Sequence, residues 1–265
     1  MTENSVIIEG TEIKYLRAGR GQPLILVHGI GSDCHVWEGL IEELQRHYEL
    51  FAITLPTYGT KNIYKHIYSI NTYPKVLGEF VKTLQIVRPV LIGHSFGTLI
   101  NLEYTALHPR RVGKLVLIAS PLKDQTTKTP LSWKLGLKLA LDSKLILRLM
   151  EYVGESKRAN WLAQKFMGGN VEPENYAKIF EKWPPQSLAL CFRDIVKKQF
   201  KKIILRINVP ILFICGNHDN VIKKFNGAAL YPLAKNKQLV TLDGDHFLPA
   251  NNAEEVARLI IKFVG

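Results

Sequence analysis

A lone serine stands between two glycines at the point where an apolar run gives way to a helical pattern. The stretch from Arg88 to Thr105 reads RPVLIGHSFGTLINLEYT and contains the spacing Gly93-x-Ser95-x-Gly97. In a sharp strand-to-helix turn such a serine presents its hydroxyl above the sheet, and the backbone passes too close for side chains at the glycine positions. The helix behind it favours negative charge near its N-terminus. The spacing therefore predicts a nucleophile elbow with Ser95 as the nucleophile.

A serine hydroxyl is a weak nucleophile, so it needs a positioned base, and the base needs a carboxylate. His246 follows the last apolar run in LVTLDGDHFLPANNAEEVARLI, and Asp219 follows the preceding run in VPILFICGNHDNVI. Both then lie on loops at carboxyl ends of strands, where open parallel sheets build their sites. Asp243 and Asp245 are alternative acids, but residues adjacent on a loop rarely face each other well. The sequence favours Asp219.

A fourth motif, LVHGIGSD, ends the third apolar run. Acyl transfer creates an oxyanion, and the loss of one preorganised donor for it costs about 10²–10³ in rate. We expect the N–H groups of Ile30 and Phe96 to supply this pair of donors. We interpret His28 and His94 as structural residues, with His28 bonded to backbone. Cys34 lacks an elbow, so we interpret it as a core or rim residue.

These residues need a parallel sheet to position them. Apolar runs from Leu24 onward are continuous, which predicts strands buried on both faces, and helical patterns alternate with them. Strand and helix in repetition indicate crossover units with helices on both faces. The first two runs, separated by EGT, predict a hairpin. The expected strands are Val6–Ile8, Ile13–Leu16, Leu24–Val27, Leu50–Leu55, Val90–Ile92, Leu115–Ala119, Ile211–Cys215 and Leu239–Leu242; the expected helices are Val36–Arg46, Thr72–Leu84, Phe96–Leu107 and Ala253–Phe263.

The alternation stops between positions 122 and 208, where the pattern is helical throughout. We expect an α/β core over 1–121 and 209–265, interrupted by a helical cap over 122–208. The cap carries 17 Lys or Arg residues against 8 Asp or Glu residues, whereas the rest of the chain carries 18 against 15. Such a basic excess can attract a membrane surface or nucleic acid. No nucleic-acid motif accompanies it, so we expect no nucleic-acid partner and retain membrane-surface contact as an alternative to a solvated face.

Composition limits the setting of the protein. Cys34, Cys191 and Cys215 are too few and too scattered for a disulfide framework or a zinc site, which favours a reducing, cytoplasmic location. The start, MTENSVIIEG, does not have the pattern of a secretory signal. No apolar run approaches the roughly 18 residues that a membrane span requires. We therefore expect a cytoplasmic protein without a membrane span.

Together, HGIG, GHSFG, GNHD and GDHF, in this order, resemble the motifs of the α/β-hydrolase superfamily. The resemblance covers nearly the whole chain outside 122–208. It implies an α/β fold with a mostly parallel eight-stranded sheet, flanking helices and a cap inserted after the sixth strand. The chain departs from the family pattern after the fourth strand, where ITLPTYGTKN puts Thr54 in place of the usual aspartate. Asp245 also stands before His246, where the family often has glycine.

These observations predict a serine hydrolase, similar to a carboxylesterase, that cleaves an ester or related acyl compound through an acyl-enzyme. No cofactor or metal is required. Carbon–carbon bond hydrolases and acyltransferases use the same triad, so both stay open. A ligand-binding or receptor protein with the same fold and little or no turnover is the rival from another class. The apolar cap favours a hydrophobic acyl substrate, and the sequence does not indicate an oligomeric state.

Overall fold

The computed structural model of the protein describes residues 1–56, 68–121, 195, 198–219, 221–222 and 227–265. The chain divides into two compact units: Met1–Pro56, Thr72–Asp124 and Gln199–Gly265 form the first, and Thr57–Asn71 and Gln125–Lys198 the second. Every helix and strand named below belongs to the first unit. Most of the cap predicted over 122–208 lies outside the described residues, so the cap stays a prediction.

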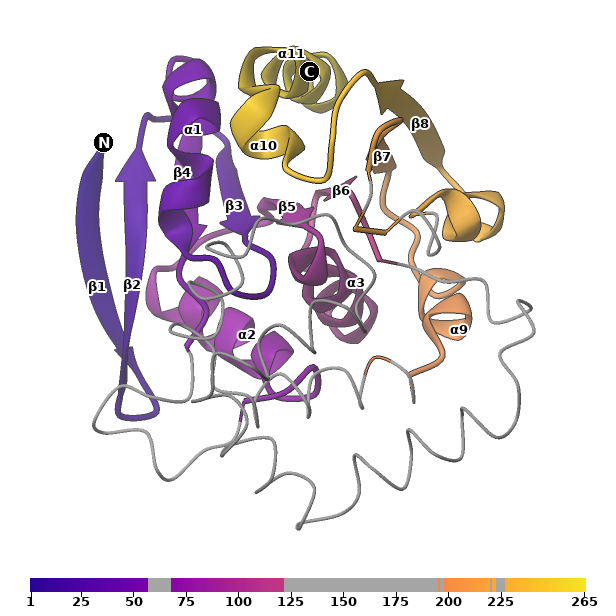
Figure 1. The fold of residues 1–265 in the computed structure, drawn as a ribbon. Coiled ribbons are helices and arrows are strands. Elements are labelled where there is room, and N and C mark those ends of the chain that lie inside the picture. The colour runs from indigo at the N-terminus through magenta and orange to yellow at the C-terminus, as the bar shows by residue number, and fades with distance from the viewer. Residues whose placement is uncertain (57–67, 122–194, 196–197, 220, 223–226) are drawn as a thin grey trace, which may run out of the picture. The chain divides into compact units, whose positions relative to one another are not determined.

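The first unit contains an eight-stranded sheet with the order β1-β2-β4-β3-β5-β6-β7-β8 (Figure 1). β1 pairs antiparallel with β2, and β2 antiparallel with β4, whereas all the other neighbouring strands are parallel. The mostly parallel sheet of eight strands and the N-terminal hairpin are thus confirmed. The strands are β1 (Thr2–Ile8), β2 (Thr11–Ala18), β3 (Pro23–Val27), β4 (Glu49–Ile53), β5 (Val90–His94), β6 (Lys114–Ile118), β7 (Ile211–Gly216) and β8 (Lys237–Leu242).

Burial explains why continuous apolar runs mark the central strands. β3, β4, β5 and β6 are buried along almost their whole length, because helices cover both faces of the sheet. The two edge strands, β1 and β8, instead expose several of their residues to solvent. A parallel sheet that is buried on both faces requires this contrast between centre and edge.

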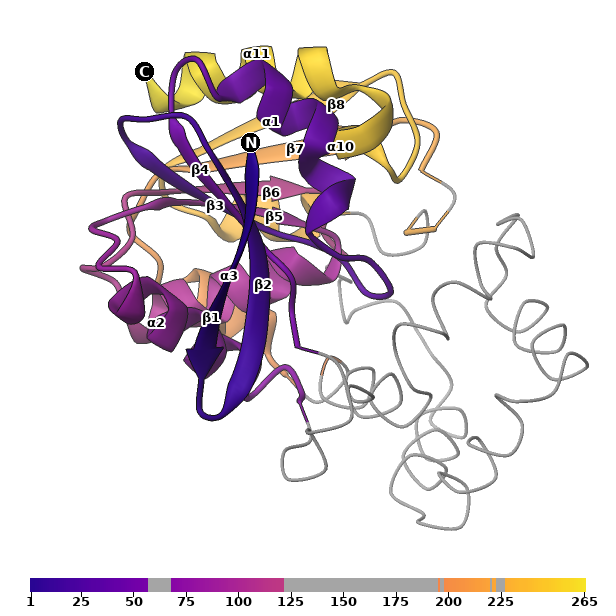
Figure 2. The ribbon, with the colours of Figure 1, turned by 90° about the vertical axis from the view of Figure 1, so that its left-hand side faces the viewer.

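Helices form a layer on each side of the sheet (Figures 1 and 2). α1 (Glu38–Leu44) and α11 (Ala253–Val264) bury their apolar side chains against one face, together with Trp37 at the end of the turn before α1. α2 (Tyr73–Thr83), α3 (Phe96–Leu107) and α9 (Phe200–Ile204) lie on the opposite side. α3 begins directly after β5, so its N-terminus lies at the carboxyl edge of the sheet.

The predicted helices over 72–84, 96–107 and 253–263 are confirmed to within one residue. The helix predicted over 36–46 is shorter, since it starts as the 3-10 turn η1 (Cys34–Trp37), in which Asp33 Oδ1 accepts a hydrogen bond from His35 N at 3.0 Å. Two further short elements, η2 (Gly227–Leu233) and α10 (Leu248–Asn251), carried no periodic signal in the sequence.

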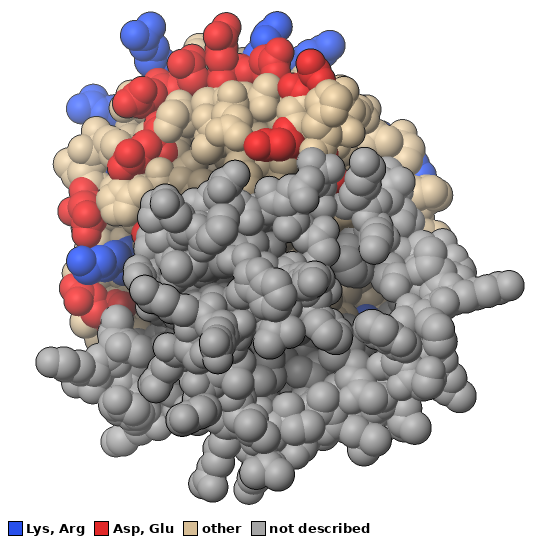
Figure 3. Space-filling view, viewed as in Figure 1, with Lys and Arg blue, Asp and Glu red and all other residues tan. Residues whose placement is uncertain are grey.

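Charged side chains of both signs are interspersed over the described surface around α11 and α1 (Figure 3). On α11 the acidic pair Glu254 and Glu255 lies in the first turn and Lys262 in the last, which suits the helix dipole. The strong basic excess of the sequence falls mainly on positions that the structure does not describe. Among the helices in the described ranges, none combines the length and the apolar character needed to cross a bilayer.

Candidate active site

Ser95 occupies the turn between β5 and α3. Its φ of 49° and ψ of −117° lie outside the regions that non-glycine residues prefer. Its N–H donates to Ile118 O at 2.9 Å, which ties the turn to the end of β6. A strained conformation of this kind persists only where the surrounding structure enforces it, and it often marks a functional site. The backbone of the predicted elbow is therefore present, with the Ser95 side chain only partly buried.

The two glycines beside Ser95 are required by space. A Cβ on Gly93 would lie 2.7 Å from Gly97 C and from Thr98 N, and a Cβ on Gly97 would overlap Val27 O and lie 2.7 Å from His28 O. Atoms in a folded core do not approach so closely. The backbone thus passes too close for side chains at both glycines, as the spacing predicted, and the first turn of α3 packs directly on the end of β3.

The loop after β3 lies against the serine. A Cβ on Gly29 would stand 3.1 Å from the Cβ of Ser95, so these two backbone segments are in direct contact. Ile30 follows Gly29, and Phe96 follows Ser95 as the first residue of α3. The two N–H groups predicted to stabilise an oxyanion therefore come from adjacent segments at one edge of the sheet.

His28 is fully buried beneath this loop, and its partners fix its tautomer. Leu55 N donates to His28 Nε2 at 2.9 Å, so that nitrogen carries no proton, and Nδ1–H donates to Gly29 O at 2.7 Å. In a trans peptide the C=O and the following N–H point in opposite directions. A hydrogen bond on Gly29 O therefore also fixes the direction of the Ile30 N–H. The interpretation of His28 as a backbone-bonding residue is confirmed.

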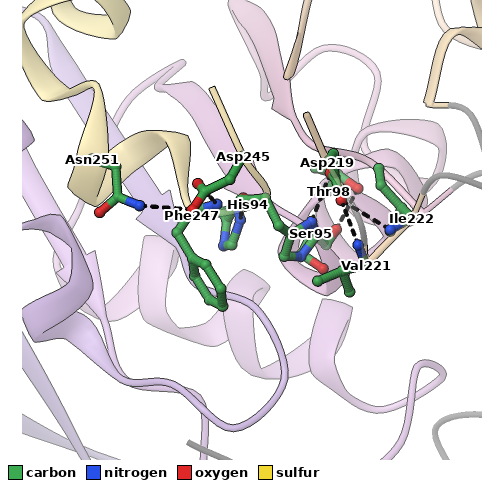
Figure 4. Close-up of polar contacts among 10 residues, drawn as sticks. His94, Ser95, Thr98, Asp219, Val221, Ile222, Asp245, Phe247 and Asn251 are labelled. Atoms are coloured by element: carbon green, nitrogen blue, oxygen red, sulfur yellow. Dashed lines mark hydrogen bonds and ion pairs between the residues drawn. The ribbon is translucent and has the colours of Figure 1, made fainter. Parts of the chain in front are cut away.

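His246 and Asp219 form a buried pair. His246 Nδ1 lies 2.8 Å from Asp219 Oδ2, and the two residues are 5% and 6% exposed. Asp219 Oδ1 accepts hydrogen bonds from Val221 N and Ile222 N, both at 2.9 Å (Figure 4). Burial alone would raise the pKa of Asp219, but the hydrogen bond and charge of His246 and the two backbone donors hold it below its usual value. The ionised carboxylate places the imidazole proton on Nδ1 and leaves Nε2 as an acceptor.

The two other carboxylates near the candidate base have different partners. Asp245 Oδ1 accepts the backbone N–H of Phe247 at 2.8 Å (Figure 4). Asp243 Oδ1 accepts a hydrogen bond from Asn217 Nδ2 at 3.0 Å. Of the three aspartates considered from the sequence, Asp219 is thus the one hydrogen-bonded to the imidazole of His246.

His94, which directly precedes Ser95 in the chain, links Ser95 to His246. His94 Nε2 lies 2.8 Å from His246 O, and the two imidazole rings have centroids 5.0 Å apart. Within the described part of the chain no hydrogen bond joins the Ser95 hydroxyl to His246. The structure therefore pairs His246 directly with Asp219, and it brings Ser95 to the same edge of the sheet through its neighbour.

Comparison with known proteins identifies the family. A family model described as the alpha/beta hydrolase fold matches residues 22–253. The chain belongs to this family. The chain is 26% identical over 234 residues to a pimeloyl-(acyl-carrier protein) methyl ester esterase of Pseudoalteromonas atlantica, which corresponds to 85% of this chain and 87% of the relative.

Solved structures share the α/β-hydrolase fold with this chain. A bromoperoxidase from Bacillus anthracis superposes with a TM-score of 0.77 at 19% identity and covers 99% of both chains. The enol-lactonase from Burkholderia xenovorans LB400 superposes with a TM-score of 0.71 at 20% identity, over 98% of this chain and 99% of that chain. At these identities the superpositions establish the fold alone.

The departure of this α/β hydrolase after β4 has a structural role. Thr54, in place of the usual aspartate, accepts a hydrogen bond from Cys34 N through its Oγ1 at 3.2 Å. Cys34 is buried, and burial raises the pKa of its thiol, which disfavours the thiolate that a cysteine nucleophile needs. Among the described residues, no group of three His, Cys, Asp or Glu side chains could hold a metal ion.

His94 is the residue whose contacts sequence reasoning missed. The motif indicated a structural role, but gave no sign that the ring would contact the loop of His246. The pKa of His94 is lowered to about 3, mainly by burial and also by the nearby His246 and His28, while the bond to the His246 carbonyl and the charge of Asp219 act in the opposite direction. The ring is therefore neutral at ordinary pH.

This neutral ring makes stability depend on pH. The unfolded chain binds a proton at His94 below pH 6.5 and the folded chain does not, so the stabilisation is complete above pH 6.5 and falls as the pH falls toward 3. The loss reaches about 5 kcal/mol of unfolding free energy over that range, at about 1.4 kcal/mol per pH unit. The free energy of unfolding, measured by urea denaturation between pH 7 and pH 4, should fall less steeply with decreasing pH for His94→Gln than for the wild type. His47→Gln, which changes an exposed histidine, is the control and should keep the wild-type dependence of the unfolding free energy on pH.

Proposed function

We propose that the protein is a serine hydrolase that cleaves a carboxylic ester, or a closely related acyl compound, through an acyl-enzyme. Ser95 is the nucleophile, His246 the base and then the acid, and Asp219 the carboxylate that orients and stabilises the imidazole. The N–H groups of Ile30 and Phe96 stabilise the oxyanion. This mechanism requires no cofactor.

The observation that carries the proposal is the buried pair of His246 and Asp219 beside a serine in a strained turn. Asp219 holds the imidazole proton on Nδ1, so the unprotonated Nε2 is the nitrogen available to a hydroxyl. The hydrogen bond from Ser95 to the base is expected to form as substrate binds, since such bonds are often long in the free enzyme. A serine, an imidazole and an ionised carboxylate on three strand ends of an α/β hydrolase support acyl transfer.

The reaction follows from these positions. His246 Nε2 accepts the Ser95 proton while Ser95 Oγ attacks the carbonyl carbon, and the negative charge that develops on oxygen is met by the two amides. The imidazolium then protonates the leaving alcohol, and the acyl group remains on Ser95. Water, activated by the same imidazole, releases the acid. Asp219 stays ionised throughout, which agrees with its lowered pKa.

An apolar acyl group suits the side chains around the serine. Phe247 and Val221 are exposed, at 39% and 43%, although both are apolar. The Phe247 ring lies 6.3 Å from that of His94, the neighbour of Ser95, and 5.5 Å from that of His246, measured between centroids. The relative from Pseudoalteromonas atlantica is named as a methyl ester esterase, which favours an ester of a carboxylic acid. Cytoplasmic location and contact of the basic cap with a membrane surface stay predictions.

The test uses covalent labelling. The protein is incubated with a fluorophosphonate probe and digested, and the labelled peptide is identified by mass spectrometry. The proposal predicts a single modified position, Ser95, and loss of aryl acetate hydrolysis in parallel with labelling. A folded protein that stays unlabelled and binds an acyl ligand without turnover would instead be the ligand-binding rival. Product analysis with an alcohol present as an acceptor that competes with water separates ester hydrolysis from acyl transfer. A vinylogous diketone offered as substrate tests for carbon–carbon cleavage.

A further inference from the structure

His94 contacts all the segments that the proposed chemistry brings together. It is the last residue of β5 and directly precedes Ser95. Its Nδ1 lies 3.3 Å from the place where a Cβ on Gly29 would stand, which puts the ring against the loop after β3. Its ring also lies 5.0 Å from that of His246 and 6.3 Å from that of Phe247, measured between centroids (Figure 4). One buried side chain thus lies between the serine, the oxyanion loop and the base.

The tautomer of the His94 ring is determined by its hydrogen-bond partner. A carbonyl oxygen only accepts hydrogen bonds, so His94 Nε2, 2.8 Å from His246 O, must carry the proton. The neutral ring then has a bare Nδ1, which is buried and has no hydrogen-bond partner among the described residues. An unpaired buried nitrogen destabilises the fold. If the ring served only to fill space, a phenylalanine would fill the same space without an unpaired buried nitrogen. The hydrogen bond that Nε2–H donates must therefore have a compensating role.

The loop that carries His246 has two other kinds of attachment. Asn217, at the end of β7, donates to Asp243 Oδ1 and accepts from Gly244 N through its side-chain amide. Asp245 accepts the N–H of Phe247 and so holds the start of α10. These bonds connect the loop to the β7 side and to itself. The bond from His94 connects it to the segment of the nucleophile.

On the basis of the proposed function, we propose that His94 is a positioning residue: its Nε2–H, donated to the backbone carbonyl of His246, sets the distance between the base and Ser95. His94 is only 3% exposed, so its ring acts through its protein contacts. A base displaced by about 1 Å can cost roughly 100-fold in rate. Loss of the donor should therefore lower kcat and leave KM nearly unchanged.

Two substitutions separate the donor from the ring. His94→Gln keeps an N–H donor, because the amide nitrogen of glutamine lies as many bonds from Cβ as Nε2 of histidine does. His94→Phe keeps an aromatic ring between Trp37 and His246 and has no donor. For an aryl acetate, kcat of the Phe variant should fall roughly 10- to 100-fold with KM within about twofold. The Gln variant should stay within about fivefold of the wild type in kcat.

The opposite order would overturn the inference. If His94→Phe kept more of the wild-type kcat than His94→Gln did, or if both matched the wild type, the ring would serve packing alone. Thermal denaturation of both variants shows which fraction is folded under assay conditions. Fluorophosphonate labelling of the wild type is the first measurement, so that failure of the proposed function, with no labelling of Ser95, is distinguished from failure of this inference.

A measurement on the unmodified protein covers the case in which a variant does not fold. Long-range ¹H–¹⁵N correlation spectra of the ¹⁵N-labelled wild type report which ring nitrogen of each histidine carries the proton. The inference requires His94 to be protonated at Nε2 and bare at Nδ1, at a pH where His246, His28 and Asp219, the groups that face the ring, keep the pairing described above. A His94 ring protonated at Nδ1 would contradict it.

Discussion

Ser95→Ala is expected to lower kcat for an aryl acetate by about 10⁶ and to abolish labelling by a fluorophosphonate. The methyl side chain of alanine cannot form the acyl-enzyme, so only the residual effect of the oxyanion donors and of substrate binding would remain. The folded state should be preserved, because the strained φ of 49° at this position is enforced by the packing of β5 and α3. Stopped-flow or long-time-course hydrolysis, with the thermal unfolding curve recorded beside it, measures both effects.

Ser120→Ala is a matched control for this prediction. Ser120 lies just past the end of β6, and its hydroxyl is bonded to Thr98 Oγ1 at 2.7 Å beneath the first turn of α3. The substitution removes a hydroxyl close to the elbow and should keep kcat within about tenfold. Turnover by Ser95→Ala at a rate comparable to that of Ser120→Ala would mean that the ester is cleaved by a different group, and the assignment of the nucleophile would be wrong.

Sequence reasoning could select the proposed catalytic residues because each of them depends on a local requirement. Gly93 is required because the first turn of α3 folds back closely on the end of β5, and Gly97 because α3 approaches the end of β3. Ser95 lies in the turn between them. Asp219 and His246 could be placed because parallel strands end at one edge of the sheet, so loops far apart in the sequence come together there. The expected fold and strand pairing follow from the same continuous apolar runs.

The partners of the buried histidines could not be read in this way. His28 bonds to a backbone donor 27 positions away, and His94 to a carbonyl 152 positions away. Which ring edge faces which backbone group depends on loop conformations that periodicity does not specify. The same limit applies to the choice among Asp219, Asp243 and Asp245, where the sequence argument rested on loop stereochemistry and the hydrogen bonds decide the pairing.

Asp219→Asn is expected to lower kcat by about 10⁴, as the equivalent change does in a serine protease. The reason follows from the contacts of the carboxylate. Oδ1 accepts the N–H groups of Val221 and Ile222, so an asparagine would keep its oxygen there and turn its NH₂ group toward His246. A donor facing His246 Nδ1 forces the imidazole proton onto Nε2. The lone pair that should accept the Ser95 proton would then be absent.

Asp243→Asn and Asp245→Asn complete this comparison. Asparagine at 245 can still accept the N–H of Phe247 through its amide oxygen, and the side chain of Asp243 is 84% exposed. Both variants should therefore keep kcat within about tenfold of the wild type, at equal labelling rates. Measured at pH 7, where the lowered pKa of Asp219 keeps it ionised, the three variants differ in which carboxylate has lost its charge. A loss of activity at 245 as large as that at 219 would transfer the role of the acid to the neighbouring residue. If only Asp219→Asn loses activity, the rate depends on the tautomer of the His246 imidazole.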